Sequence, residues 1–312
     1  MKIITNVPCT VDPKEVARIK GLGFLRDKTT GDKFNCRVIT RNGKITADES
    51  RAIADAAEKY GNGEIAMTSR MTVEVQGIPY ENVNAFIEFL AEKGLETGGT
   101  GPKVRPVVSC KGTTCQYGLI DTFALSEQIH KDFYKGYRPV KLPHKFKIAV
   151  GGCPNNCVKP DINDLGIIGQ RVPAFNDAVC VGCGLCAKLC PMDAIEIKDK
   201  KAVRNREICN NCGRCIPTCK LGAITAEKNG CKIYIGGRWG KKVARGTAFD
   251  KIFESETEAL STVEKVILFY KENVTPGERF ADTITRIGFE NVEKEILTDE
   301  IFRRKDEILK NE

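Results

Sequence analysis

The chain has 312 residues, of which 41% are hydrophobic and 29% are charged, values typical of a globular protein with one large domain or two to three smaller ones. The net charge of +8 comes without a basic tract interleaved with aromatic residues and with only two histidines, so nothing points to a nucleic-acid-binding protein. The apolar runs are too short for a membrane span and the first residues do not read as a signal peptide, so we expect a cytoplasmic protein.

Residues 1–100 alternate between strand-like and helix-like stretches. Residues 33–40 and 71–78 carry apolar and β-branched side chains with a period of two, which predicts strands. Residues 47–60 and 81–93 carry apolar side chains three or four positions apart, which predicts helices, and Asp48 is a candidate cap for the first. This order predicts an α/β sandwich layer.

The rest of the chain surrounds a compositionally distinct insert at residues 171–227. Before it, a glycine-rich turn at 98–101 precedes a predicted helix around 119–134 and a predicted strand over 145–150. After it, we expect a strand over 231–235, a glycine-rich turn at 236–240, and amphipathic helices over 255–272 and 276–295. The chain has no phosphate loop and no dinucleotide-binding glycine motif, so its electrons must come from a partner protein.

Eight of the fifteen cysteines lie in the insert, in two runs with the spacing C-x2-C-x2-C-x3-C. This is the bacterial ferredoxin pattern, in which three cysteines of one run and the last of the other hold each [4Fe–4S] cluster. Structural zinc is the alternative, and two complete runs disfavour it. The pattern assigns one cluster to Cys180, Cys183, Cys186 and Cys219, and the other to Cys209, Cys212, Cys215 and Cys190.

Two further pairs of cysteines, Cys110 with Cys115 and Cys153 with Cys157, flank a predicted helix and strand. Two pairs at the ends of such elements can converge on one cluster; a structural zinc site or two unrelated turns are the alternatives. The three remaining cysteines are most simply buried small apolar residues. They are Cys9, Cys36 and Cys231.

These motifs resemble the sirohaem-containing sulfite and nitrite reductases, in which a C-x5-C pair and a later C-x3-C pair surround a [4Fe–4S] cluster. Cys157 occupies the position of the family cysteine that also binds the sirohaem iron, whereas Cys110 and Cys115 have four residues between them rather than five. With its embedded ferredoxin-type insert, the chain resembles the catalytic C subunit of anaerobic sulfite reductase or a related small clostridial-type sulfite/nitrite reductase.

The resemblance implies an α+β fold with three parts. Residues 1–100 would form a ferredoxin-like α/β sandwich, the half domain of these reductases. Residues 101–170 and 228–312 would form the sirohaem-binding α/β domain, and residues 171–227 the inserted two-cluster [4Fe–4S] bacterial ferredoxin module.

Several basic residues lie in segments similar to the family's anion-binding segments, although any single lysine or arginine is more often a solvated surface group. Lys145 and Lys147 stand two apart on a presumed strand, so they would share one face and repel each other unless an anion lies between them. The two histidines, His130 and His144, are expected to be structural or surface groups. The resemblance implies that Lys145 and Lys147 face the sulfite oxygens and that Arg37 and Arg105 bind the substrate and the sirohaem carboxylates. It places Arg70, Gly237 and Arg238 near the macrocycle.

The resemblance implies reduction of sulfite to sulfide by sirohaem and a coupled [4Fe–4S] cluster, with electrons relayed through the two clusters of the insert from an external flavoprotein or ferredoxin-type donor. Nitrite reduction to ammonia by the same centre is one alternative, and a pure electron-transfer protein with three clusters and no sirohaem is the other. Larger family members contain two copies of the unit that this chain supplies once, which implies a homodimer or a complex of several subunits rather than a compact monomer.

Overall fold

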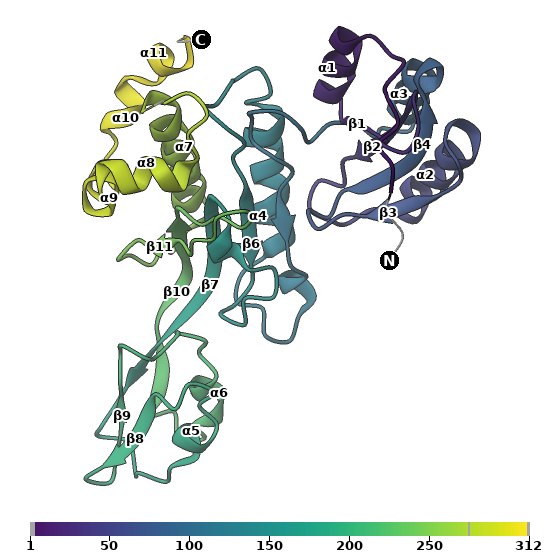
Figure 1. Cartoon of the computed structure of the whole chain (residues 1–312). Helices are drawn as coiled ribbons and strands as arrows, with labels where there is room; N and C mark the ends of the chain where they lie inside the picture. Colours follow the sequence, from purple (N-terminus) through teal and green to yellow (C-terminus); the bar gives the residue numbers. More distant parts are fainter. Residues whose placement is uncertain (1–3, 274, 311–312) are drawn as a thin grey trace.

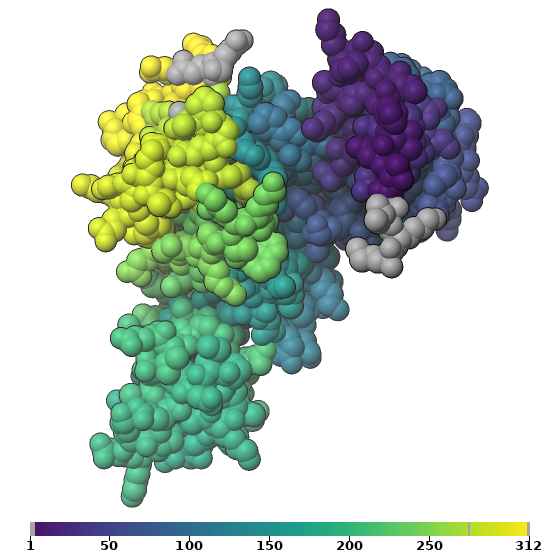
Figure 2. Space-filling model, in the orientation of Figure 1, coloured from purple at the N-terminus to yellow at the C-terminus, as the bar shows by residue number. Residues whose placement is uncertain are grey.

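The chain folds into three lobes, each with its own hydrophobic core (Figure 1). The computed structural model describes residues 4–273 and 275–310. The smallest lobe projects from the rest of the molecule, as the space-filling view shows (Figure 2). Within the described ranges, no helix combines the length and the apolar character needed to cross a bilayer.

The N-terminal lobe is a four-stranded antiparallel sheet covered by helices, with strand order β1-β2-β4-β3. Its core includes Phe34 from a predicted strand and Phe86 from a predicted helix. Phe24 joins them from a short strand that the sequence patterns did not predict. The strands are β1 (Phe24–Arg26), β2 (Lys33–Val38), β3 (Ile65–Met67) and β4 (Val73–Pro79). The helices are α1 (Pro13–Gly21), α2 (Ala47–Tyr60), the 3-10 turn η1 (Tyr80–Asn82) and α3 (Val83–Glu92).

Helix α2 spans the predicted range, but its cap differs from the prediction. The Thr46 hydroxyl accepts a hydrogen bond from the Glu49 N–H (3.1 Å), and the Glu49 carboxylate accepts one from the Thr46 N–H (2.7 Å). This reciprocal capping box leaves Asp48 inside the first turn, where its charge still favours the helix N-terminus. The prediction that Asp48 caps the helix was therefore wrong.

The central lobe is built on a five-stranded mixed sheet with strand order β11-β10-β7-β6-β5. Strands β5, β6 and β7 are parallel, whereas β10 runs antiparallel to both of its neighbours. The strands are β5 (Val108–Ser109), β6 (Ile148–Gly151), β7 (Leu165–Phe175), β10 (Ile224–Ile235) and β11 (Thr247–Ala248). The turns η2 (Gly112–Thr114) and η4 (Pro160–Ile162) flank this sheet.

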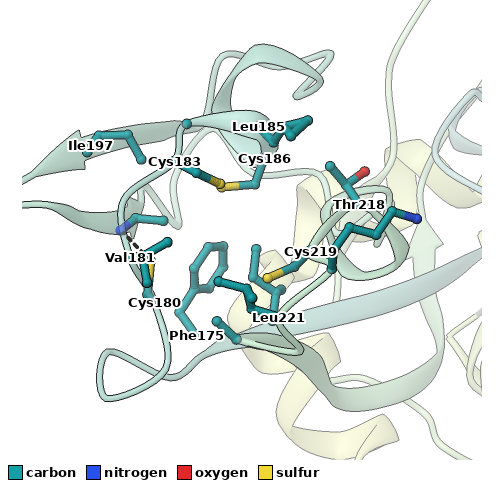
Figure 3. A pocket seen from close by; sticks show the side chains of 15 residues that line it. Phe175, Cys180, Val181, Cys183, Leu185, Cys186, Ile197, Thr218, Cys219 and Leu221 are labelled. Atoms are coloured by element: carbon teal, nitrogen blue, oxygen red, sulfur yellow. Dashed lines mark hydrogen bonds between the residues drawn. The ribbon is translucent and has the colours of Figure 1, made fainter.

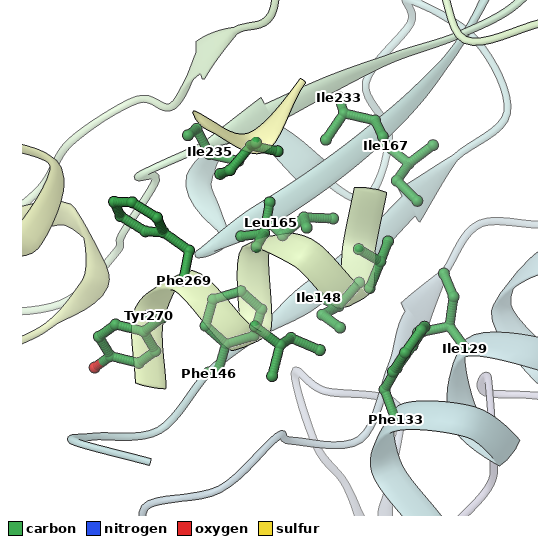
Figure 4. Packing of buried hydrophobic residues seen from close by; sticks show 14 of the residues in the cluster. Ile129, Phe133, Phe146, Ile148, Leu165, Ile167, Ile233, Ile235, Phe269 and Tyr270 are labelled. Atoms are coloured by element: carbon green, nitrogen blue, oxygen red, sulfur yellow. The ribbon is translucent and has the colours of Figure 1, made fainter. Parts of the chain in front are cut away.

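Helices α4 (Thr122–Ile129) and α7 (Glu256–Glu272) bury their apolar faces on this sheet (Figure 4). Helix α4 continues as the π-helical turn η3 (His130–Lys135), so the predicted helix exists but changes its pitch near its end. The core includes Ile129, Phe133, Ile148, Leu165, Ile167, Ile233, Ile235 and Phe269.

Within residues 275–310, the C-terminal segment contains four helices rather than the single predicted one. Gly288 adopts a φ of 91°, a left-handed value that ends the first of them and starts the second, so the prediction of one helix over 276–295 was wrong. The helices are α8 (Phe280–Ile287), α9 (Phe289–Ile296), α10 (Glu300–Arg303) and α11 (Lys305–Lys310).

The third lobe stands at the end of a long two-stranded arm. Strands β7 and β10 pair from Leu165↔Ile235 to Phe175↔Ile224, with one irregularity at 226–228, and continue well beyond the rest of the sheet (Figure 1). The lobe contains α5 (Leu185–Lys188), the antiparallel pair β8 (Ile195–Lys198) and β9 (Lys201–Arg204), and α6 (Cys215–Thr218). Since the arm belongs to both lobes, the proposed insert boundaries at 171 and 227 fall within continuous strands.

Candidate active site and cluster-binding cysteines

The N-terminal and central lobes meet at Arg70, in the turn before β4. Its guanidinium group donates to the carbonyl oxygens of Pro106 (2.7 Å) and Ile148 (3.2 Å) and to the Asn163 side chain (3.0 Å). Burial lowers the pKa of Arg70 to about 10, with contributions from the nearby cations Arg105 and Arg37. Arg70 therefore ties three segments of the central lobe to the N-terminal sheet.

Lys145 and Lys147 flank the fully buried Phe146, which forms an isolated bridge with Val104. Strand β6 begins only at Ile148, so the two lysines precede the strand rather than lying on it as predicted. Their alternation around a core residue still directs both away from the core, because side chains in extended backbone alternate. Burial lowers the pKa of Lys147 to about 8, and burial also lowers that of Lys145.

Arg37 and Arg105 complete the predicted set of cations. Arg37 lies on β2, where its Nε pairs with the Glu74 carboxylate at 3.3 Å. Arg105 donates to the Gly99 carbonyl oxygen, and burial, followed by the charge of Arg37, lowers its pKa to about 10. These charges act on one another and on Lys145, so the structure gathers cations from four distant segments into one cluster. The cluster, called the basic pocket below, consists of Arg37, Arg70, Arg105, Lys145 and Lys147 together with the two residues described next.

Sequence reasoning missed two members of this pocket, Arg279 and Asp164. Arg279 precedes α8 and pairs with the fully buried Asp164 at 2.9 Å. No local motif marks either residue, so only the tertiary fold reveals them.

Unpaired donors remain in the pocket. The Nε atoms of Arg70, Arg105 and Arg279 are buried without a hydrogen-bond partner. Buried charged groups are costly unless they are paired, so an anion close to these cations would stabilise the cluster. The residues present therefore fit a polyanionic cofactor such as sirohaem together with a small oxyanion.

The cysteines of the two isolated pairs lie together. Burial raises the pKa of the Cys153 thiol, and the neighbouring Cys110, Cys157 and Cys115 raise it further. The Gly152 N–H donates to the Cys110 sulfur at 3.1 Å, and the turn η2 accommodates the shortened spacing up to Cys115. This convergence fits the ligands of one cluster.

The loop over residues 153–164 connects these cysteines to the basic pocket. Within it, the Asn156 side chain donates to Asp161 (2.8 Å), and Asn163 accepts from Arg70. Gly237 packs against this loop so closely that a Cβ atom would lie 2.3 Å from the Asp161 carbonyl oxygen. The Arg238 guanidinium, by contrast, pairs with Asp282 at 2.7 Å, and its predicted contact with a cofactor stays a prediction.

The remaining residues singled out from the sequence have structural surroundings. His130 is buried, stacks on Tyr134, and lies 3.5 Å from the Glu96 carboxylate. Cys36 and Cys231 are buried as predicted, but Cys9 is partly exposed, so the prediction of burial was wrong for Cys9.

In the third lobe, one cavity is lined by cysteines from both runs (Figure 3). The rest of its lining is mainly apolar and includes Phe175, Leu185 and Ile224. The Ala202 N–H donates to the Cys180 sulfur at 3.4 Å. The four cysteines at this cavity are Cys180, Cys183, Cys186 and Cys219, the set that the ferredoxin pattern assigns to one cluster.

The second set of cysteines in this lobe lies closer to the central lobe than the first set does. Burial raises the pKa of Cys215 to about 12, with contributions from Cys209 and Cys212. A polar cavity is lined by both Cys212 and Cys153, so the second run faces the four-cysteine group of the central lobe. The membership of Cys190 in this second set stays a prediction.

Contacts at this junction fix the two lobes together. The Arg171 N–H donates to the Asn211 carbonyl oxygen (2.8 Å), and the Arg214 guanidinium donates to the Asn155 side chain (3.0 Å). Arg214 also stacks over the Tyr117 ring, 4.4 Å from its centroid.

All fifteen cysteines are free thiols in the structure. Among residues 4–273 and 275–310, no three or more His, Cys, Asp or Glu side chains form a group suited to a single metal ion. In a cubane cluster each thiolate binds a different iron, so its cysteines stand farther apart than the ligands of one ion.

The grouped cysteines indicate the class of protein, an iron–sulfur protein, and the basic pocket beside them fits an anionic ligand. Residues 100–304 match the family described as nitrite and sulphite reductase 4Fe-4S domain, and residues 26–93 match the nitrite/sulfite reductase ferredoxin-like half domain. The chain therefore belongs to the nitrite and sulfite reductase family, as its motifs predicted.

Among its relatives, the coenzyme F420-dependent sulfite reductase of Methanocaldococcus jannaschii is 40% identical over 245 residues, covering 78% of this chain and 38% of the relative. The C subunit of the anaerobic sulfite reductase of Salmonella typhimurium is 37% identical over 168 residues, covering 48% of each chain. The chain thus spans less than half the length of these two relatives. Nitrite reductases are also among its relatives.

The crystal structure of dissimilatory sulfite reductase I superposes with a TM-score of 0.70 at 20% identity, covering 86% of this chain and 70% of the other. This likeness confirms the predicted α+β fold of the sulfite and nitrite reductase type. The two-cluster nature of the third lobe stays a prediction.

Proposed function

We propose that the chain reduces sulfite to sulfide with sirohaem and a coupled [4Fe–4S] cluster. The observation that carries the proposal is the basic pocket, which one short loop joins to four clustered cysteines. The names of the two sulfite reductase relatives support this choice of substrate.

Sirohaem would supply an iron atom that binds the substrate sulfur and passes electrons to it. Cys110, Cys115, Cys153 and Cys157 would hold the adjacent cluster, with the exposed Cys157 also reaching the sirohaem iron. Arg37 and Arg105 would hold the substrate oxygens or cofactor carboxylates through charge-assisted hydrogen bonds. Arg70 and Gly237 would shape the surroundings of the macrocycle.

Proton supply falls to the lysines. Sulfite must lose its oxygen atoms as water, so each leaving oxygen needs protons. With a pKa of about 8, Lys147 can donate a proton near neutral pH more readily than an ordinary lysine. Lys145 lies two residues before Lys147, so its side chain would lie on the same side of the segment and add positive charge there.

Nitrite is the alternative substrate, since it is also a small oxyanion suited to a basic pocket. An electron-transfer protein without sirohaem is the alternative function. A visible spectrum of anaerobically purified protein separates this alternative from a reductase, because sirohaem absorbs in the red. Rates with sulfite and nitrite on the same preparation then decide the substrate.

We further propose that the third lobe relays electrons to this centre through two [4Fe–4S] clusters. Its second cysteine run faces the Cys153 loop, whereas the cavity of the first set lies within the lobe. Electrons from an external donor protein would therefore pass the cluster of Cys180, Cys183, Cys186 and Cys219 first. The chain would work in the cytoplasm as a homodimer or in a complex of several subunits, as the named subunits among its relatives imply.

Replacing Cys183 or Cys212 by serine should damage one cluster of the lobe and strongly reduce activity with the natural donor. A small artificial reductant that reaches the sirohaem directly should restore much of that activity. Assays of both variants with both reductants check this prediction. Failure of the artificial reductant, with sirohaem content unchanged, would contradict a purely conductive lobe.

A further inference from the structure

Asp164 is a buried acidic group within the basic pocket. Its carboxylate accepts a hydrogen bond from the Lys147 N–H (2.9 Å) and two from Arg279 Nη2 (2.9 and 3.1 Å). Its carbonyl oxygen accepts from the Gly236 N–H at 3.0 Å. Asp164 thus joins the lysine segment, the second glycine-rich turn and the C-terminal segment.

The charge of Asp164 acts on the pocket as a whole. Burial lowers the pKa values of Arg70, Arg105 and Lys147, and the Asp164 carboxylate opposes this lowering in each case. Burial raises the pKa of Asp164 itself, against the charge of Arg279. A carboxylate in this position keeps the cations of the pocket protonated.

Arg279 brings the C-terminal segment into the pocket. Its side chain is 16% exposed, and one of its nitrogens, Nη2, is taken up by Asp164. Its Nε is buried without a hydrogen-bond partner. Its charge lowers the pKa values of Lys145, Lys147 and His144, in each case after burial, so it belongs to the same electrostatic group.

The pocket has more positive charge than its acidic groups balance. Among the ion pairs of the described residues, Glu74 pairs with Arg37 and Asp164 pairs with Arg279. The four cations Arg70, Arg105, Lys145 and Lys147 share the field of Asp164. An anion between these cations and the partly exposed Arg279 side chain would offset this excess.

We propose that Arg279 is an anion-binding residue of the pocket and that Asp164 is the positioning residue that orients Arg279 and the Lys147 backbone. The anion is a substrate oxyanion or a cofactor carboxylate. This identity of the anion rests on the proposed function, whereas the anion-binding role of Arg279 does not. The guanidinium group of Arg279 suits both, because it keeps its charge and donates charge-assisted hydrogen bonds to anionic oxygens.

Arg279→Gln tests the first half of the proposal. If Arg279 holds a cofactor carboxylate, sirohaem per chain should fall by about tenfold or more. If it holds the substrate, sirohaem content should stay normal and KM for sulfite should rise by about tenfold or more. Arg279→Lys keeps the positive charge but lacks the guanidinium group, so its sirohaem content and KM should lie between those of wild type and Arg279→Gln.

Arg286→Gln is the matched control, since Arg286 lies on α8 and pairs with Glu278 on the protein surface. The sirohaem content and the KM for sulfite of Arg286→Gln should both match those of wild type. If Arg279→Gln does not fold, as a thermal melt would show, Arg279→Lys decides alone. Sirohaem content and KM both within about twofold of wild type in the Arg279 variant that folds would overturn the proposal.

Asp164→Asn tests the positioning role. Loss of the carboxylate charge leaves Lys147 facing burial and the cations Arg70, Lys145 and Arg279, so its pKa should fall further. The alkaline limb of the rate should therefore move to lower pH, a change that a merely structural defect would not produce. An unshifted pH profile in a folded variant would overturn the positioning role.

The proposed function can fail separately. If wild-type protein contains no sirohaem and reduces no sulfite, calorimetric titration of the apoprotein with sulfite replaces the activity assay. Arg279→Gln should then bind sulfite about tenfold more weakly than wild type. Equal titration curves for the two proteins, including two flat ones, would overturn the role of Arg279.

Discussion

Replacing Lys147 by alanine should slow sulfite reduction about a hundredfold while leaving sirohaem content near normal. The side chain is half-buried among cations, and its lowered pKa of about 8 suits a proton donor near neutral pH. Its backbone is held by Asp164 and by the adjacent sheet, so truncation beyond Cβ should not unfold the segment. Steady-state rates and the red absorbance of the purified variant measure the two effects.

The pH profile should carry the same signature. As pH rises through about 8, Lys147 loses its proton, so the wild-type rate should decline there and the Lys147→Ala rate should not. Lys141→Ala is the matched control, because Lys141 lies in the same segment but is exposed. Near-wild-type turnover in Lys147→Ala would remove this lysine from the substrate site.

Sequence patterns correctly predicted those elements that depend on neighbouring residues in the chain. The apolar periodicity of α2 fixed both of its ends, and the cysteine spacing of the third lobe identified residues that line one cavity. The helix over 276–295 was mispredicted because its apolar positions continue in phase across Gly288, where only the positive φ breaks the helix. The misplaced cap of α2 has a similar cause, since Thr46 stands just before the range in which the apolar pattern begins.

The candidate site shows the same division. Arg37, Arg70, Arg105, Lys145 and Lys147 lie in short segments that resemble family segments, so the sequence could propose them. Arg279 and Asp164 do not lie in segments that resemble family segments. They are 115 residues apart in the sequence and come into contact only in the fold. A single arginine before a surface-type helix is indistinguishable from a solvated one until the fold places it against a buried carboxylate.

Replacing Cys157 by serine should abolish sulfite reduction with the natural donor and with a small artificial reductant alike. Cys157 lies with Cys110, Cys115 and Cys153, and it is the exposed member of that group. A cysteine thiolate is a far better ligand for iron–sulfur clusters than a serine hydroxyl. If Cys157 joins the cluster to the sirohaem, a reductant that delivers electrons to the sirohaem cannot bypass its loss.

This behaviour separates Cys157 from the cysteines of the third lobe, whose loss the artificial reductant should bypass. The spectroscopic test is the electron paramagnetic resonance of the reduced protein, where the Cys157 variant should lose the magnetic coupling between cluster and sirohaem iron. Cys9→Ser is the matched control, since Cys9 is partly exposed and belongs neither to the four cysteines of the central lobe nor to those of the third lobe. If Cys157→Ser retains both coupling and turnover while Cys9→Ser behaves as wild type, the bridge between cluster and sirohaem must come from another residue.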